Sequence, residues 1–172
     1  MLLDKYQSLF DFDSPDAAGE WQTVNDGVMG GLSDGRFRIT QAKTMLFFGT
    51  LSLENNGGFA SVRSRPGNTN LEKGDTIVLR VRGDGRQYSL NLYTQTRRTA
   101  FSYRAMFETT KDSWTEVRIP LYSFVATSFG QTVDGPPLDP VEVSAVGFLL
   151  GDKKAGSFEL EVEWIKVLKT EQ

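Results

Sequence analysis

The segment TIVLRVRGDGRQYSLNLY, residues 76–93, decides the fold class. Its first half alternates Ile77, Leu79 and Val81 with polar or small residues, and its second half alternates in the same way. A period of two is typical of a strand that buries one face and exposes the other. The Gly-Asp-Gly sequence at 83–85 favours a tight turn, so the segment predicts a β-hairpin.

The same period recurs outside this segment, in residues 101–108 and 157–164. Shorter strand candidates are residues 9–12, 21–24, 36–39, 46–53, 59–63, 115–119 and 141–150. The only helical expectation is a short turn after Pro120, around residues 121–124. About eleven short antiparallel strands with Gly-rich turns predict one all-β domain over residues 1–172, built as a β-sandwich or a barrel.

The composition excludes most catalytic and metal chemistry. The 172 residues contain no His and no Cys. This removes thiolate nucleophiles, His bases, disulfides and Cys- or His-ligated metals. We therefore expect a non-catalytic protein without a cofactor. A structural calcium ion bound partly by backbone carbonyl groups stays an alternative, because acidic residues cluster at Asp11, Asp13, Asp16 and Glu20.

Three sequence patterns that suggest a function are interpreted as structural instead. Residues 31–35, GLSDG, match the G-x-S-x-G pattern of serine hydrolases, but a strand follows them and no His is available. Residues 82–84, RGD, are the turn of the expected hairpin. Glu159, Glu161 and Glu163 share one strand face, which is typical of a solvated sheet surface.

A signal peptide has a basic region followed by an apolar stretch. The first residues of this chain do not show that pattern. No apolar run approaches the ~20 residues of a membrane-spanning helix. These features predict an intracellular protein, and we expect it in the cytoplasm, with a mitochondrial or plastid location as the alternative if a presequence has been removed.

The charge distribution suggests a binding face. The net charge is −3, yet residues 63–104 contain nine basic and three acidic residues, and the first of them, Arg63, is itself a candidate binding residue. If the apolar side chains of this block point into the core, the polar side chains that alternate with them point together toward solvent. Arg, Tyr and Asn are residue types of protein interaction sites and can also bind a sugar. The members of this expected face are Arg80, Arg82, Ser89, Asn91, Tyr93, Arg104 and Met106.

Two turn sequences add further candidates for binding residues. Asn25-Asp26-Gly27 and Asn55-Asn56-Gly57 favour backbone turns, with ligand contacts as a second interpretation. Met29 is interpreted as a plug in the core, with an exposed contact for a partner as the alternative. Trp21 and Trp114 each begin a strand and are expected to be core residues.

Five blocks of the sequence, taken in order, carry a resemblance to a known family. They are 21–33 (WQTVNDGVMGGLS), 48–63 (FGTLSLENNGGFASVR), 82–88 (RGDGRQY), 103–107 (YRAMF) and 114–121 (WTEVRIPL). Together they resemble the complex I intermediate-associated protein 30 family, from about Phe10 to Val167. The resemblance implies a galactose-binding-like jelly roll and a role as an assembly factor for a respiratory NADH dehydrogenase, with protein subunits as partners.

This chain lacks the N-terminal extension of the mitochondrial member, which implies a bacterial or stand-alone version and leaves its client open. The sequence is therefore compatible with three functions. The first is an assembly factor that binds a protein client. The second is a carbohydrate-binding module, since jelly rolls often bind sugars. The third is an RNA or nucleotide binder, which the acidic net charge disfavours, so no stable nucleic-acid partner is expected.

Overall fold

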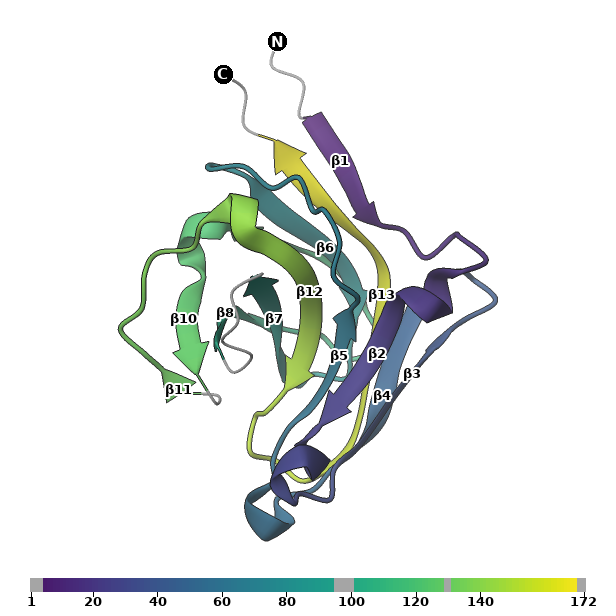
Figure 1. The fold of residues 1–172 in the computed structure, drawn as a ribbon. Helices are drawn as coiled ribbons and strands as arrows, with labels where there is room; N and C mark the ends of the chain where they lie inside the picture. Colours follow the sequence, from purple (N-terminus) through teal and green to yellow (C-terminus); the bar gives the residue numbers. More distant parts are fainter. Residues whose placement is uncertain (1–4, 95–100, 129–130, 170–172) are drawn as a thin grey trace.

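The computed structural model describes residues 5–94, 101–128 and 131–169, and these residues form two antiparallel β-sheets packed face to face (Figure 1). None of the helices in these ranges is long and apolar enough to cross a membrane. The expected antiparallel sandwich is confirmed.

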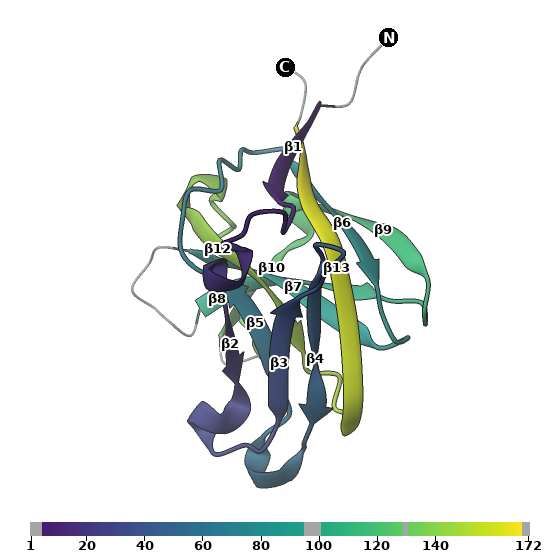
Figure 2. The same cartoon turned by 90° about the vertical axis from the view of Figure 1, so that its right-hand side faces the viewer.

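Sheet A is centred on β13 (Gly156–Lys169), the longest strand (Figure 2). One edge of β13 pairs first with β4 and then with β1, and its other edge pairs with β6. The remaining strands of the sheet are β1 (Lys5–Phe10), β3 (Asp34–Ile39), β4 (Met45–Leu51), β6 (Thr76–Arg82) and β9 (Trp114–Pro120).

Sheet B has the order β11-β10-β8-β7-β12-β5-β2. Its strands are β2 (Trp21–Asn25), β5 (Ala60–Ser64), β7 (Gln87–Thr94), β8 (Phe101–Glu108), β10 (Val125–Ser128), β11 (Gln131–Thr132) and β12 (Val143–Leu150). Figure 1 shows that this sheet curls, with β10 and β12 on either side of β7 and β8. Its outer face, which points away from sheet A, lies on the inside of the curl.

The sequence pattern located eleven of the strands but not β10 and β11. These two are short, and four or two residues are too few to show a period. The expected helical turn after Pro120 is present as the 3₁₀ helix η4 (Leu121–Ser123). Four further 3₁₀ helices in the described ranges are η1 (Ala17–Glu20), η2 (Asp26–Met29), η3 (Glu54–Asn56) and η5 (Pro140–Glu142).

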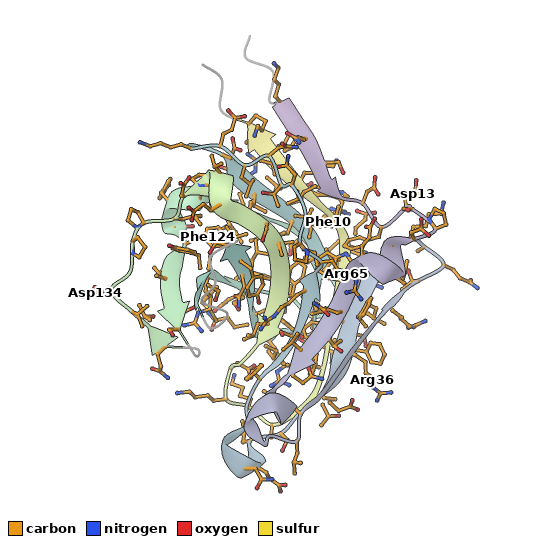
Figure 3. The ribbon with its side chains drawn as sticks, viewed as in Figure 1. Phe10, Asp13, Arg36, Arg65, Phe124 and Asp134 are labelled. Atoms are coloured by element: carbon orange, nitrogen blue, oxygen red, sulfur yellow. The ribbon has the colours of Figure 1, made fainter. Side chains whose placement is uncertain are left out.

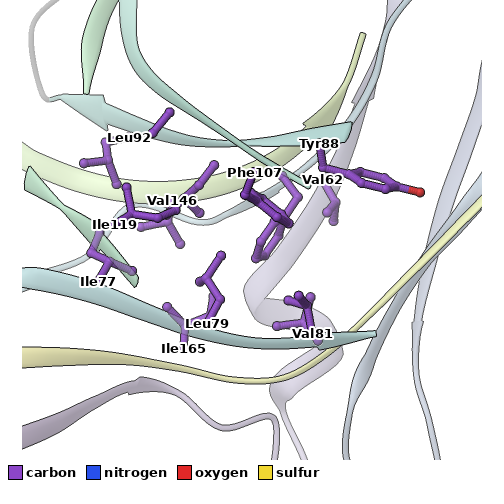
Figure 4. Close-up of a cluster of buried hydrophobic side chains, with 14 of the residues drawn as sticks. Val62, Ile77, Leu79, Val81, Tyr88, Leu92, Phe107, Ile119, Val146 and Ile165 are labelled. Carbon is purple, nitrogen blue, oxygen red and sulfur yellow. The ribbon is translucent and has the colours of Figure 1, made fainter. Parts of the chain in front are cut away.

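The core lies between the two sheets (Figure 4). Leu79 and Ile165 of sheet A are fully buried there with Val146 and Tyr88 of sheet B. At roughly 25 cal/mol per Å² of apolar area removed from water, such burial is the main term that stabilises the sandwich.

The predicted hairpin at residues 83–85 is wrong. The strands on either side, β6 and β7, belong to different sheets, so the Gly-Asp-Gly sequence forms a corner that crosses the sandwich. The alternation misled the interpretation because both strands bury their apolar side chains in the same core from opposite sides. Arg86 fixes the corner by a two-pronged contact to Asp152, with Nε–Oδ2 and Nη2–Oδ1 distances of 2.9 and 2.7 Å.

Candidate functional site

The expected face of Arg, Asn and Tyr side chains is divided between the two sides of the sandwich. Arg80 and Arg82 lie on β6 and point out from sheet A, whereas Asn91, Tyr93 and Arg104 lie in sheet B. The prediction that all of them point outward together is therefore wrong. This prediction failed because it assumed the hairpin at residues 83–85, which would have kept β6 and β7 in one sheet.

Arg80 and Arg82 already have partners within the chain. Arg80 Nε lies 2.7 Å from Glu163 Oε2, and Arg82 Nη2 lies 2.6 Å from Glu161 Oε1. Both guanidinium groups also lie over the ring of Trp114, at 5.5 and 5.1 Å from its centre. Glu161 and Glu163 are thus members of an ion-pair ladder rather than an isolated solvated row.

The two tryptophans have different positions. Trp21 is buried in the core, as expected, and its ring contacts Phe10 at 4.9 Å between centres. Trp114 is not a core residue. It is half-buried on the outer surface of sheet A, because the inward positions of β9 are those of Val117 and Ile119.

The polar outer surface of sheet B is the stronger candidate site. Strand register places Gln22, Arg63, Gly147, Asn91 and Arg104 in one row across β2, β5, β12, β7 and β8. We define the Arg63 face as this row together with its neighbours on the same side of the sheet. These neighbours are Ser61, Ser89, Tyr93, Met106 and Val125.

Arg63 and Tyr93 form the centre of the Arg63 face. The Arg63 guanidinium carbon lies 4.5 Å from the centre of the Tyr93 ring, a cation–π contact. Gly147 makes room both for the neighbouring strand and for this stack, because a Cβ atom there would lie 2.8 Å from Val62 O, 3.1 Å from Tyr93 Cε2 and 3.2 Å from Arg63 Cγ. The glycine was not predicted as a site residue, although a glycine inside a strand signals a close approach.

A short chain of hydrogen bonds positions Tyr93. Ser89 Oγ donates to Asn91 Oδ1 at 2.9 Å, and Asn91 Nδ2 donates to the Tyr93 hydroxyl at 3.4 Å. Ser89 and Asn91 are buried although they lie on the outer surface of the sheet. Burial raises the pKa of the Tyr93 hydroxyl above its usual value and the nearby Arg63 offsets part of this, so the ring stays neutral at physiological pH.

Arg63 is held differently from its neighbours. Within the described ranges this half-buried residue makes no ion pair, and its Nε atom is buried without a hydrogen-bond partner. Arg65, two residues further along, donates from Nε to Gly19 O of η1 at 2.8 Å (Figure 3). Arg97 and Arg98 of the basic block lie outside the described residues.

The edge of the Arg63 face opens into a hollow. It has a volume of about 630 Å³ and lies between residues 104–108 of β8 and residues 117–120 of β9, with Met106, Glu108 and Val125 among the side chains that line it. Met106 and Val125 are each 46% exposed, so the hollow presents apolar surface next to the row of polar residues.

The two turn sequences form a separate hydrogen-bonded cluster around η2 and η3, at the foot of Figure 1. The Asp26 carboxylate is fully buried and accepts bonds from Ser33 N (3.0 Å), Ser33 Oγ (2.6 Å), Gly58 N (2.7 Å) and Phe59 N (3.2 Å). Burial alone would raise the pKa of Asp26, but these hydrogen bonds outweigh it and lower the pKa below its usual value. Asp26 joins the two motif loops and is not available to a ligand.

The other predicted residues of these loops are placed as follows. Asn25 donates from Nδ2 to Gly35 O at 3.0 Å, which ties β2 to β3. Asn55 is exposed and has a positive φ of 56°, typical of an Asn in a tight turn. The side chains of Met29 and Asn56 lie outside the described part of the structure, so both interpretations of Met29 stay predictions.

The acidic residues before β2 do not converge. Asp13 pairs with Lys43 at 2.7 Å and points outward (Figure 3), while Asp11 accepts a bond from the backbone of Asp13. In the described ranges no three acidic side chains gather closely enough to hold a metal ion. The calcium alternative is untested.

Sequence comparison identifies the relatives of this chain. A family model described as complex I intermediate-associated protein 30 (CIA30) matches residues 10–162. The mitochondrial complex I intermediate-associated protein 30 of Mus musculus is 28% identical over 189 residues, which cover 97% of this chain and 57% of that protein. The protein of the same name from Drosophila melanogaster is 26% identical, covering 91% of this chain and 61% of its own length.

Solved structures with a similar fold include carbohydrate-binding proteins. A family 11 carbohydrate-binding module from Clostridium thermocellum, in complex with a β-1,3-1,4-mixed-linked tetrasaccharide, has a TM-score of 0.74 and 14% identity, with 99% of this chain and 98% of that chain covered. An agarase has a TM-score of 0.66 and 9% identity, covering 96% of this chain and 25% of the enzyme. At these identities the likeness concerns the fold alone.

The relatives correct one expectation and establish another. Both are named as mitochondrial proteins, which contradicts the cytoplasmic location expected from the sequence, and that expectation is withdrawn. The chain spans about 57–61% of their length. The family model, in contrast, covers nearly the whole sandwich, from the last residue of β1 into the middle of β13. The chain therefore belongs to the complex I intermediate-associated protein 30 family.

Proposed function

We propose that this chain is a non-catalytic assembly factor that binds a protein client belonging to a respiratory complex of the NADH dehydrogenase type. The observation that carries the proposal is the family match over residues 10–162. It includes all five sequence blocks that suggested the family. Because the relatives are named as mitochondrial, the proposal extends to a client in the compartment that holds this enzyme.

The chemistry of the surface supports binding rather than catalysis. The chain has no His and no Cys, and its buried carboxylates at Asp26, Asp75 and Asp152 are each occupied by hydrogen bonds within the fold. The Arg63 face instead offers Arg, Tyr, Asn and Met side chains beside a hollow, a composition found in protein interaction sites.

Deletion and complementation test the proposal. The gene is removed from the native host, and the amount of assembled NADH dehydrogenase is followed by native gel electrophoresis with an in-gel activity stain. We expect the deletion to lower the fully assembled enzyme and to accumulate smaller subcomplexes, and expression of the wild-type chain to restore it. Normal assembly in the deletion strain would contradict the proposal.

Sugar binding is the second candidate, favoured by the fold likeness to a module solved with a mixed-linked tetrasaccharide. Against it, one face of the Tyr93 ring is covered by the Arg63 guanidinium, so this tyrosine is not an open stacking platform. Calorimetric titration of the chain with a β-1,3-1,4-glucan tetrasaccharide tests this candidate. Heat that saturates on addition of the sugar would favour it, and a flat titration would remove it.

A further inference from the structure

Arg63 is a cation that the fold positions but does not neutralise. Arg80, Arg82 and Arg86 each face a carboxylate at 2.6–2.7 Å, whereas no carboxylate of the described residues pairs with Arg63. Taking a guanidinium partly out of water without a counter-charge costs free energy. A fold that accepts this cost on a strand paired along both edges, β5, has a group prepared for an external anion.

The position of Arg63 is fixed before any partner arrives. Its side chain lies along the space left by Gly147 and stacks on Tyr93, which Asn91 and Ser89 hold by hydrogen bonds. A guanidinium that is already oriented loses little conformational entropy when it binds, and its planar fork of N–H donors matches the two oxygens of a carboxylate.

A second cation lies in the same row. Arg104 is separated from Arg63 by β12 and β7, so the two backbones are about 14 Å apart at the usual spacing of ~4.8 Å between strands. None of the ten residues that define the Arg63 face is acidic, and Glu108, two positions after Met106 on β8, lies in the lining of the hollow at its edge. The face therefore complements a ligand that carries at least two negative groups at separate positions along an extended chain.

We propose that the Arg63 face binds an acidic segment of the protein client, with one carboxylate on the Arg63 fork and a second beside Arg104. This inference rests on the proposed function, since it names the chemistry of the surface that the client presents. The hollow beside Met106 and Val125 then takes the apolar side chains that follow the acidic residues.

A titration with model peptides tests the proposal. The probe is a fluorescein-labelled oligoglutamate peptide, and an oligoglutamine peptide of equal length is its uncharged control. Anisotropy is recorded with the full chain at low and at physiological ionic strength. We expect the oligoglutamate to bind the wild type, to weaken with salt, and to weaken by about tenfold or more with Arg63→Gln.

Arg38→Gln is the matched control. Arg38 is exposed on β3 of sheet A and makes no ion pair within the described ranges, so its replacement changes the net charge equally on a different surface. Affinity should be unchanged in this variant and intermediate in Arg63→Lys, which keeps the charge without the planar fork. Thermal melts check that each variant folds, and Arg104→Gln replaces Arg63→Gln if the latter does not.

Equal affinity of the wild type and a folded Arg63→Gln or Arg104→Gln variant would overturn the proposal. So would binding of an oligouridylate RNA or of the glucan tetrasaccharide in place of the peptide, with loss of that binding in the same variants. These failures differ from failure of the proposed function. If the wild-type chain restores NADH dehydrogenase assembly but does not bind oligoglutamate through Arg63, only the present inference is lost.

Discussion

Replacing Asp26 by Asn tests the claim that the family motif builds a structural cluster rather than a ligand site. Asp26 Oδ2 accepts three of the four hydrogen bonds, from Ser33 Oγ, Gly58 N and Phe59 N, and Oδ1 accepts the fourth, from Ser33 N. An asparagine fits the same space. Its amide nitrogen breaks the fewest hydrogen bonds if it takes the Oδ1 position, which accepts only one. There it would face the Ser33 N–H, and two hydrogen-bond donors would oppose each other.

The cost follows from these contacts. Leaving one buried N–H unpaired costs about 1–3 kcal/mol, and the three remaining bonds weaken because a neutral acceptor replaces a charged one. We expect Asp26→Asn to lower the free energy of unfolding by about 3 kcal/mol. For a domain of this size that corresponds to a fall in Tm of about 6–12 °C.

The effect should depend on pH in a defined direction. The hydrogen bonds lower the pKa of Asp26 in the folded state, so the stability contributed by its charge is present above the unfolded value of about 3.9. It is lost as the pH falls below this value and through the folded pKa. The gap in Tm between the wild type and Asp26→Asn should therefore be full at neutral pH and shrink in acid.

Circular dichroism melts at neutral pH and at a series of acidic values measure this gap. Asp134→Asn is the control, because Asp134 is exposed in the loop before η5 (Figure 3) and its replacement removes one charge without a buried bond. A neutral-pH Tm for Asp26→Asn within about 1 °C of the wild type would refute the reasoning. A gap that stays constant into acid would refute the assignment to the Asp26 charge.

Three further predictions concern the rest of the fold. Gly31→Ala should cost about 1–3 kcal/mol in urea unfolding, because its Cβ would lie 2.3 Å from Asp26 Cγ, whereas Gly67→Ala has no atom within 4 Å and should be neutral. Arg86→Ala should cost about 3 kcal/mol, since it leaves the buried Asp152 carboxylate unpaired, and a double-mutant cycle with Asp152→Ala should show the coupling. Arg80→Ala should cost less than about 1 kcal/mol and leave oligoglutamate binding unchanged, since its ion pair with Glu163 is exposed and lies on sheet A; a loss of binding would return Arg80 to the site.

The sequence was informative about strands because their period is local. Residues 76–82 and 101–108 were predicted with the bounds of β6 and β8, since each alternates over seven or eight residues. The sheet to which each strand belongs depends on partners far away in the chain. Nothing in residues 83–85 distinguishes a hairpin from a corner, and the Arg86–Asp152 contact that marks the corner joins residues 66 positions apart.

The candidate site was predicted in part for the same reason. Asn91, Tyr93 and Arg104 were expected to share a face, and they do, because β7 and β8 are neighbours along the chain and in the sheet. Arg63 was a candidate as the first residue of the basic block, but its contact with Tyr93 depends on β12 lying between β5 and β7. Gly147 was not predicted as a site residue. A glycine inside a strand signals a close approach, but which groups approach it depends on the arrangement of β5, β12 and β7.

Site-specific photocrosslinking in the host shows which face of the chain contacts the client. A photoreactive phenylalanine analogue is placed at Met106, which is 46% exposed on the Arg63 face, and in a second variant at Arg38 on sheet A, and both are irradiated in the native host. We expect a subunit of the NADH dehydrogenase to crosslink to position 106 and not to position 38. Equal crosslinking of the subunit from both positions would contradict the placement of the client, and its absence from both would contradict the assembly function itself.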